Sequence, residues 1–179
     1  ELSALFREVR GIDIRVVHLF NHESPLRGKD FVTQKICNGA ARIKLGMASE
    51  LDLGNLNVSR DWGYAPDFVD AMISIMEYPD GEDYVIATGK LNTLERLATV
   101  AFDSAGLGSW RDYIKQDDAN SRPKDNRNLR GDYSKLKSKV GWAPTKEFDE
   151  MIEEMVTHQI RLLNGNSTDE DWLNQEIAK

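Results

Sequence analysis

Residues 12–28 carry the strongest structural signal in this chain: Ile-Asp-Ile-Arg-Val-Val-His-Leu-Phe at residues 12–20, followed by Asn-His-Glu-Ser-Pro-Leu-Arg-Gly at residues 21–28. The first part is apolar and β-branched, which predicts a buried strand, although periodicity alone does not exclude a helix. Pro25 and Gly28 interrupt regular structure, so the polar part is predicted to be a loop at the carboxyl end of that strand. Ligands of open α/β sheets bind beyond the carboxyl ends of parallel strands, which makes this loop a candidate site.

The composition is that of a globular protein with a core of its own. The chain has 179 residues, of which 40% are hydrophobic and 30% charged, and its formal net charge is −7. This balance argues against a nucleic acid partner, because no basic excess is present to neutralise phosphates. Cys37 is the only cysteine, so neither an intrachain disulfide nor a cysteine-based metal cluster is expected. We expect no metal, no membrane span and a cytoplasmic location.

The rest of the chain is expected to alternate amphipathic helices with short strands. Periodicity, caps and glycine stops predict helices at residues 1–10, 31–45, 66–77, 93–105, 133–140 and 148–163. Further strands are predicted at residues 51–54, 58–62 and 84–87. Residues 106–131 read as a long polar loop, and residues 164–179 as an acidic tail. These elements indicate an α/β protein in which an α-rich lobe is attached to the edge of a parallel sheet.

The environments of several side chains are also predicted. Helical spacing gives the 66–77 helix an inward face made of Phe68, Val69, Met72, Ile73 and Met76. His18 is expected in a core or an interface, and Trp172 and Ile177 could dock the tail as a short helix. Glu154 and His158 are one helical turn apart and could bind a metal. They lack a third ligand, however, so a solvated pair is expected.

A set of short motifs resembles one known family through its order and spacing. The motifs are Asn-His-Glu-Ser-Pro at 21–25, Phe-Val-Thr-Gln-Lys-Ile at 31–36, Leu-Gly-Asn-Leu at 53–56, Arg-Asp-Trp-Gly at 60–63, Tyr-Val-Ile-Ala-Thr-Gly at 84–89, Arg-Pro at 122–123 and Lys-Val-Gly-Trp-Ala-Pro at 139–144. Residues 1–163 thereby resemble the C-terminal half of the GDP-mannose 4,6-dehydratase family, which are extended short-chain dehydrogenase/reductases.

The resemblance implies a fold and a division of the chain. The fold would be the C-terminal part of an extended Rossmann-type, doubly wound α/β fold with an α-rich substrate-binding lobe. Residues 1–30 would be the end of the Rossmann-type domain together with the site loop. Residues 31–163 would be mainly the substrate-binding lobe, with some segments returning to the sheet, and residues 164–179 the acidic tail. The chain begins at Glu1 within a helical pattern, like the end of a βαβ unit whose first part is missing.

The resemblance also implies a reaction. Members of this family use NADP to oxidise GDP-mannose at C4, eliminate water across C5–C6 and return the hydride to C6, which gives a 4-keto-6-deoxy sugar nucleotide on the route to GDP-fucose. The family's catalytic Thr, Glu and Tyr, and the Lys of Tyr-x-x-x-Lys, are expected upstream of this chain, as is the Gly-rich dinucleotide turn. We therefore expect no catalytic residue here and no activity from the chain alone.

The binding residues that the resemblance implies are spread along the chain. His22 and Arg27 would contact NADP. The positions that would bind the sugar nucleotide are Asn21, Val32, Lys35, Leu53, Gly54, Asn55, Arg60, Arg122 and Asp125. Arg60 and Arg122 would pair with the diphosphate, because a guanidinium presents a planar fork to phosphate oxygens. The chain departs from the family pattern at Leu26, where a second Arg is usual, and at residues 124–125, where Thr-Glu is usual.

Three other interpretations of these residues were considered. The neighbours His22, Glu23 and Ser24 could suggest a hydrolytic triad, but adjacent residues of an extended segment point in opposite directions. The chain could also be a non-catalytic module that binds a sugar nucleotide. A related sugar-nucleotide reductase or epimerase is a third possibility, which the Asn-His-Glu-Ser-Pro motif disfavours. The complete protein is expected to be a homodimer or homotetramer.

Overall fold

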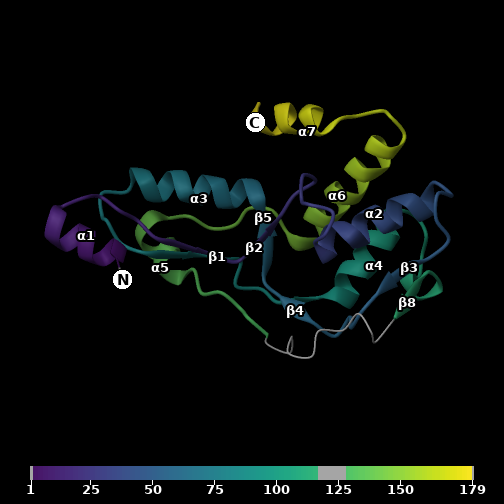
Figure 1. Ribbon diagram of the computed structural model, residues 1–179, viewed down its shortest axis with the longest axis horizontal. Coiled ribbons are helices and arrows are strands. Elements are labelled where there is room, and N and C mark those ends of the chain that lie inside the picture. Colours follow the sequence, from purple (N-terminus) through teal and green to yellow (C-terminus); the bar gives the residue numbers. More distant parts are fainter. Residues whose placement is uncertain (1, 117–127, 179) are drawn as a thin grey trace.

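The parallel pairing expected for the first strand is present in the computed structural model, which describes residues 2–116 and 128–178. β1 (Val17–Leu19) pairs in parallel with β6 (Tyr84–Ile86), and β2 (Asn21–Glu23) pairs in parallel with β5 (Trp62–Tyr64). The segments between paired strands are long, as parallel connections require. In Figure 1, β2 and β5 lie between the part of the molecule that holds α3 and the part that holds α2.

The first strand is shorter than predicted, and the predicted loop is partly strand. Residues 12–16 are outside any strand, because β6 offers only three residues for pairing. The extended chain is interrupted at Phe20, whose N–H donates to the Ile86 carbonyl, and resumes as β2 at residues 21–23. The candidate polar residues therefore begin within a strand, and the loop follows them.

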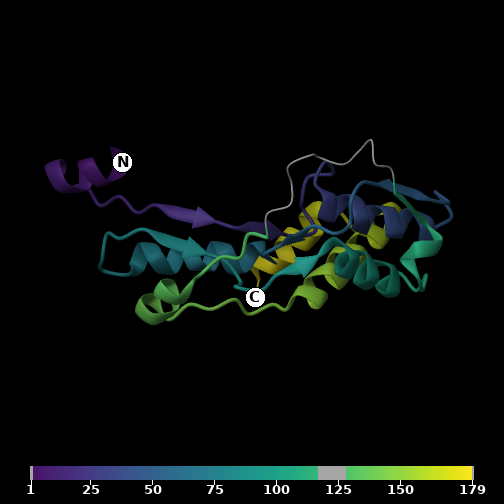
Figure 2. The same ribbon diagram turned by 90° about the horizontal axis from the view of Figure 1, so that it is seen from below.

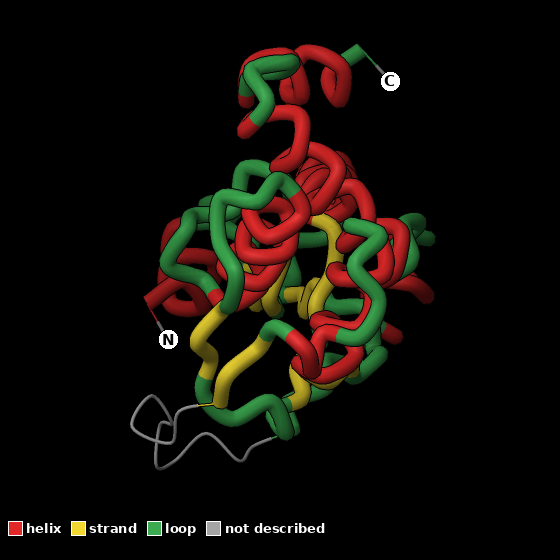
Figure 3. Tube along the Cα trace, turned by 90° about the vertical axis from the view of Figure 1, so that its right-hand side faces the viewer, coloured by secondary structure: helices red, strands yellow, loops and turns green. Residues whose placement is uncertain are grey.

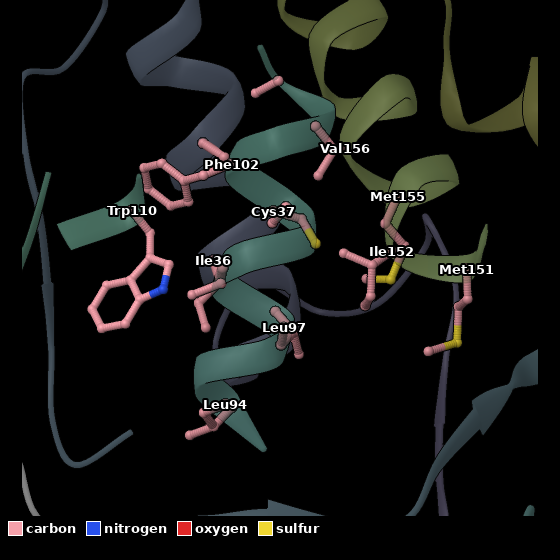
Figure 4. Packing of buried hydrophobic residues seen from close by; sticks show 14 of the residues in the cluster. Ile36, Cys37, Leu94, Leu97, Phe102, Trp110, Met151, Ile152, Met155 and Val156 are labelled. Atoms are coloured by element: carbon pink, nitrogen blue, oxygen red, sulfur yellow. The ribbon is translucent and has the colours of Figure 1, made fainter. Parts of the chain in front are cut away.

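The larger hydrophobic core lies among three helices, α2 (Val32–Lys44), α4 (Leu94–Ser104) and α6 (Phe148–Leu163). Their buried side chains interdigitate as Figure 4 shows, with Cys37 fully buried among them. Gly39 of α2 lets Leu51 pack closely against the helix, because a Cβ on Gly39 would lie 2.7 Å from a methyl carbon of Leu51. The Thr93 hydroxyl caps α4 by accepting from Arg96 N, as the sequence predicts.

Short strands border this core. β3 (Leu51–Leu53) pairs in parallel with β8 (Ile114–Gln116). The segment predicted as one strand at 58–62 is divided at Asp61, because β4 (Ser59–Arg60) pairs antiparallel with β7 (Asn92–Thr93) whereas β5 pairs with β2. The prediction of a polar loop at residues 106–131 is wrong in part. It contains β8 and the 3₁₀-helix η1 (Trp110–Asp112), which is anchored by the buried Trp110.

A second hydrophobic cluster is formed by α3 (Ala65–Glu77), β6 and α5 (Ser134–Val140). The predicted inward face of α3 is wrong in part, although Met72 does pack against this cluster. Phe68 is buried, but Val69, Ile73 and Met76 are 49%, 52% and 61% exposed, and the buried positions are Asp67, Phe68, Ala71 and Ile75. The helix is apolar on more than one side, so periodicity did not identify the face that packs. His18, predicted in a core or an interface, is exposed.

The terminal helices lie at the periphery. α1 (Leu2–Arg10) is at one end of the molecule and is attached through Arg7, which contacts Gly81 and Asp83 (Figure 2). α7 (Asp169–Ile177) projects beyond α6 at the C-terminal end (Figure 3). The tail thus docks through Trp172, as one alternative predicted, while Ile177 stays exposed. Within the described residues, no helix is long and apolar enough to cross a membrane.

Candidate functional site

The polar residues of β2 point to different sides of the strand. His22 Nδ1 donates to the Phe20 carbonyl oxygen at 2.9 Å, and the His22 ring lies 5.2 Å from the Phe68 ring. Glu23 is buried on the other side, where its Oε2 accepts from Thr33 Oγ1 at 2.5 Å. This alternation confirms that His22 and Glu23 do not form a hydrolytic triad with Ser24.

Arg27 lies over the loop that follows β2. Its Nε is 3.2 Å from Glu23 Oε2, and its Cζ is 3.5 Å from the centroid of the Phe31 ring. Burial raises the pKa of the Glu23 carboxyl above its ordinary value, although the Thr33 hydroxyl and the Arg27 charge act in the opposite direction. The carboxyl and the ring together fix the guanidinium over the loop that follows β2.

One hydrogen bond joins the two segments whose residues are predicted to line the nucleotide pocket. Lys35 on α2 donates from Nζ to the Asp52 carbonyl oxygen at 2.7 Å, which joins α2 to β3. Val32, at the start of α2, is exposed, whereas Leu53 is buried in the larger core. Gly54 follows β3, and the Asn55 side chain accepts from Asn57 N at 2.8 Å, which stabilises a tight turn.

Arg60 lies on β4, between two other segments. It pairs with Asn92 of β7 on one side and forms a bridge with Leu129 on the other. Its Nη1 donates to the Ser59 carbonyl oxygen at 2.8 Å. Asn21 is close in the same region, because it is opposite Trp62 in the β2–β5 pair. Arg122 and Asp125, the other predicted diphosphate and ribose contacts, lie outside the described residues.

The sequence analysis missed Asp61 and did not assign a role to Glu23. Both are acidic residues in apolar, strand-forming surroundings, and both are buried and hydrogen-bonded. Burying a carboxylate without hydrogen-bond donors is costly. An acidic residue in such a segment is therefore a sequence signal for a carboxylate that is buried and hydrogen-bonded.

A groove of about 560 Å³ lies between α6 and α7 and contains none of the predicted site residues. The expectation of a solvated Glu154–His158 pair is wrong here. Glu154 accepts from Tyr64 OH at 3.0 Å and from Trp172 Nε1 at 2.6 Å, and buried His158 lies 2.9 Å from Asp169 Oδ1. Within the part of the chain that is described, no group of three potential ligands could hold a metal.

One Tyr-x-x-x-Lys spacing does occur in this chain, contrary to expectation: Tyr133 and Lys137. Tyr133 precedes α5, and its ring packs edge-on against Trp142 with the centroids 5.8 Å apart. Lys137 is exposed on this seven-residue helix. The pair follows β2 in the chain, whereas the family's Tyr and Lys were expected before it, so we do not equate the two.

Comparison with known proteins agrees with the parallel strand pairing. The fold is part of the Rossmann-type α/β fold of the structural neighbours. A family model described as GDP-mannose 4,6 dehydratase matches residues 1–155, and the chain belongs to this family. GDP-mannose 4,6 dehydratase 2 of Arabidopsis thaliana is 43% identical over 157 residues, which cover 88% of this chain and 42% of that relative.

Two solved structures show the same fold. RMD from Pseudomonas aeruginosa, complexed with NADPH, superimposes with a TM-score of 0.80 and 24% identity over 90% of this chain and 52% of that one. The dTDP-glucose 4,6-dehydratase of Bacillus anthracis, in complex with NAD, has a TM-score of 0.75 and 18% identity over 98% of this chain and 51% of that one. The chain therefore spans about half the length of the relatives that it matches.

Proposed function

We propose that this chain is the substrate-binding part of a GDP-mannose 4,6-dehydratase, which converts GDP-mannose to GDP-4-keto-6-deoxymannose. The observation that carries the proposal is the family match over residues 1–155. The position of Asn21 and His22 beyond the carboxyl end of β1, where α/β sheets bind ligands, supports it.

Each part of the site has a proposed role. Asn21 would hold the sugar nucleotide, and the pocket formed by Val32, Lys35 and residues 53–55 would hold the base. Arg60 would bind the diphosphate, together with Arg122 from outside the described residues, and Asp125 would bind the ribose. In this proposal, β1, β6, α3 and α5 continue the Rossmann-type domain, and α2, α4 and α6 form the substrate lobe. The whole protein would be a cytoplasmic homodimer or homotetramer.

The residues near β2 fit a nicotinamide cofactor, which we infer to be NADP. The Arg27 guanidinium is held by Glu23 and the Phe31 ring and supplies a positive charge after β2 that suits an anionic group. Arg27 would hold a phosphate, and His22 would lie against the nicotinamide. NADP, when bound, supplies the acceptor and donor of hydride for the reaction. The residues of this chain contribute binding and orientation.

A second candidate is a sugar-nucleotide-binding module without catalysis. Both candidates require binding of GDP-mannose, and they differ only in turnover.

Calorimetric titration with GDP-mannose tests the binding role of Arg60. The Arg60→Ala variant should bind GDP-mannose more weakly by about 1.5–3 kcal/mol, because a charge-assisted hydrogen bond to phosphate is lost. Arg96→Ala is a matched control, since Arg96 is exposed on α4 and pairs with Asp149 at 2.9 Å. Equal affinities of Arg60→Ala and wild type would reject the phosphate role of Arg60.

A further inference from the structure

Asp61 is a buried carboxylate that accepts four hydrogen bonds. Its Oδ1 accepts from Thr88 N at 2.9 Å and from Thr88 Oγ1 at 2.6 Å. Its Oδ2 accepts from Gly89 N at 2.9 Å and from Gly131 N at 3.1 Å. Asp61 is 0% exposed, and all four of these partners are donors. An ionised carboxylate is the side chain that suits this arrangement, because it only accepts.

The donors belong to the two segments that flank Arg60. Thr88 and Gly89 lead into β7, where Asn92 is opposite Arg60. Gly131 comes two residues after Leu129, which forms a bridge with Arg60 from the other side. The Asp61 carboxylate therefore holds both segments that lie beside the Arg60 backbone, the one that leads into β7 and the one at residues 129–131.

Packing at Gly131 shows how closely these segments approach. A Cβ at Gly131 would lie 2.2 Å from the Ala87 Cβ and 3.0 Å from the Phe20 ring. Such a contact leaves no room for any residue but glycine. The 129–131 segment is thus held against the end of β6 by both packing and the Asp61 carboxylate.

We propose that Asp61 is a positioning residue that holds Arg60 in the orientation needed to bind the diphosphate of the sugar nucleotide. The inference rests on the proposed function of Arg60. Asp61 does not touch the ligand itself. It acts by keeping β4, β7 and the 129–131 segment in register. Arg60 is then already ordered in the folded protein, and binding does not have to order it.

The test compares two buried aspartates of the same sequence region. In Asp61→Asn, either orientation of the amide places its NH₂ group against at least one backbone N–H donor. Asp67→Asn is the matched control. Asp67 is also buried and accepts from Thr145 N at 2.9 Å, Thr145 Oγ1 at 2.6 Å and Lys146 N at 3.1 Å, but it joins α3 to residues 145–146 and not to β4. Both variants should lower the melting temperature. Only Asp61→Asn should raise the Kd for GDP-mannose, by about tenfold.

A double-mutant cycle with Arg60→Ala separates positioning from a general loss of stability. If Asp61 acts through Arg60, Asp61→Asn should change the Kd by less than about twofold in the Arg60→Ala background. Thr88→Val removes one donor and gives a milder version of the same comparison if Asp61→Asn does not fold.

Additive effects, or equal weakening by Asp67→Asn, would overturn the inference while Arg60 keeps its role. Absence of GDP-mannose binding by the wild-type chain would overturn the proposed function, and the inference with it.

Discussion

The Glu23 carboxyl is 1% exposed and lies between a hydroxyl and a guanidinium, yet burial raises its pKa above the ordinary value of 4.5. A carboxyl with a raised folded-state pKa holds its proton more tightly in the folded protein than in the unfolded one. The folded state therefore loses stability as the pH rises from the unfolded pKa through the folded pKa. The neighbouring Arg27 charge reduces this loss without cancelling it.

Glu23→Gln should make this pH dependence visible. The variant keeps the shape of the side chain and lacks the titration, so its free energy of unfolding should improve relative to wild type as the pH rises from about 4 to 7. Urea unfolding at several pH values measures the difference. Glu153→Gln, at an exposed position on α6, is the control. A difference between Glu23→Gln and wild type that is constant with pH would contradict the raised pKa.

For single residues, the position in the fold could be predicted from the sequence better than the tertiary contacts. The stretch at 21–28 was correctly predicted to follow the first strand, since Asn21 and His22 come directly after β1, which pairs with β6. The partners of Glu23 and Asp61 could not be predicted, because Thr33, Thr88 and Gly131 are distant in sequence and reach these carboxylates only through the fold. Such contacts depend on tertiary packing and leave no local periodicity.

Among the elements, helices with one apolar stripe were predicted within one or two residues, as α2 and α6 show. Helix α3 was placed correctly, but its packed face was wrong in part. Its sequence offers both a Phe68–Ala71–Ile75 stripe and a Val69–Ile73–Met76 stripe. The pattern also missed β7 and joined β4 to the start of β5 as one strand, because two-residue pairings carry no alternation.

Helix α7 is attached to α6 chiefly through Trp172, the residue of the helix that is buried. Trp172 is 9% exposed, donates to Glu154 Oε1 at 2.6 Å and lies edge-on to the His158 ring with the centroids 6.5 Å apart. A second, more exposed contact places Asp169 Oδ1 2.9 Å from His158 Nε2. The Thr168–Asp171 capping box starts the helix but does not attach it to α6. A nine-residue helix is marginal in water by itself, so its order must come from these contacts.

Trp172→Ala should therefore release α7 and leave the rest of the molecule folded. Truncation of a buried Trp costs about 3–5 kcal/mol when the structure stays in place, which is more than a peripheral helix needs to detach. Hydrogen exchange should show that the amides of residues 169–177 lose their protection and that those of α2 and α4 keep theirs. Leu173→Ala is the control, because Leu173 is exposed on the same helix. Retained protection of α7 in Trp172→Ala would show that the helix has another anchor.

At the scale of the whole molecule, binding and catalysis place different demands on the chain. The proposed diphosphate and base contacts lie on β3, β4 and α2, which share the larger core or border it. This arrangement favours binding by the chain itself. Turnover also requires a held cofactor and an acid–base group, and the sequence has no Gly-rich dinucleotide turn.

We accordingly expect the purified 179-residue chain to bind GDP-mannose without converting it. Incubation with GDP-mannose and NADP, followed by mass spectrometry for the loss of water, measures conversion. The Arabidopsis thaliana relative, assayed in parallel, is the positive control. Tyr133 and Lys137 make this a strict test, because they are the one Tyr-x-x-x-Lys pair in the chain. Conversion by a preparation of verified mass would contradict the expectation. Its loss in Tyr133→Phe would then assign the chemistry to a tyrosine that the fold places beside Trp142, immediately before α5 and not on a helix preceding β1.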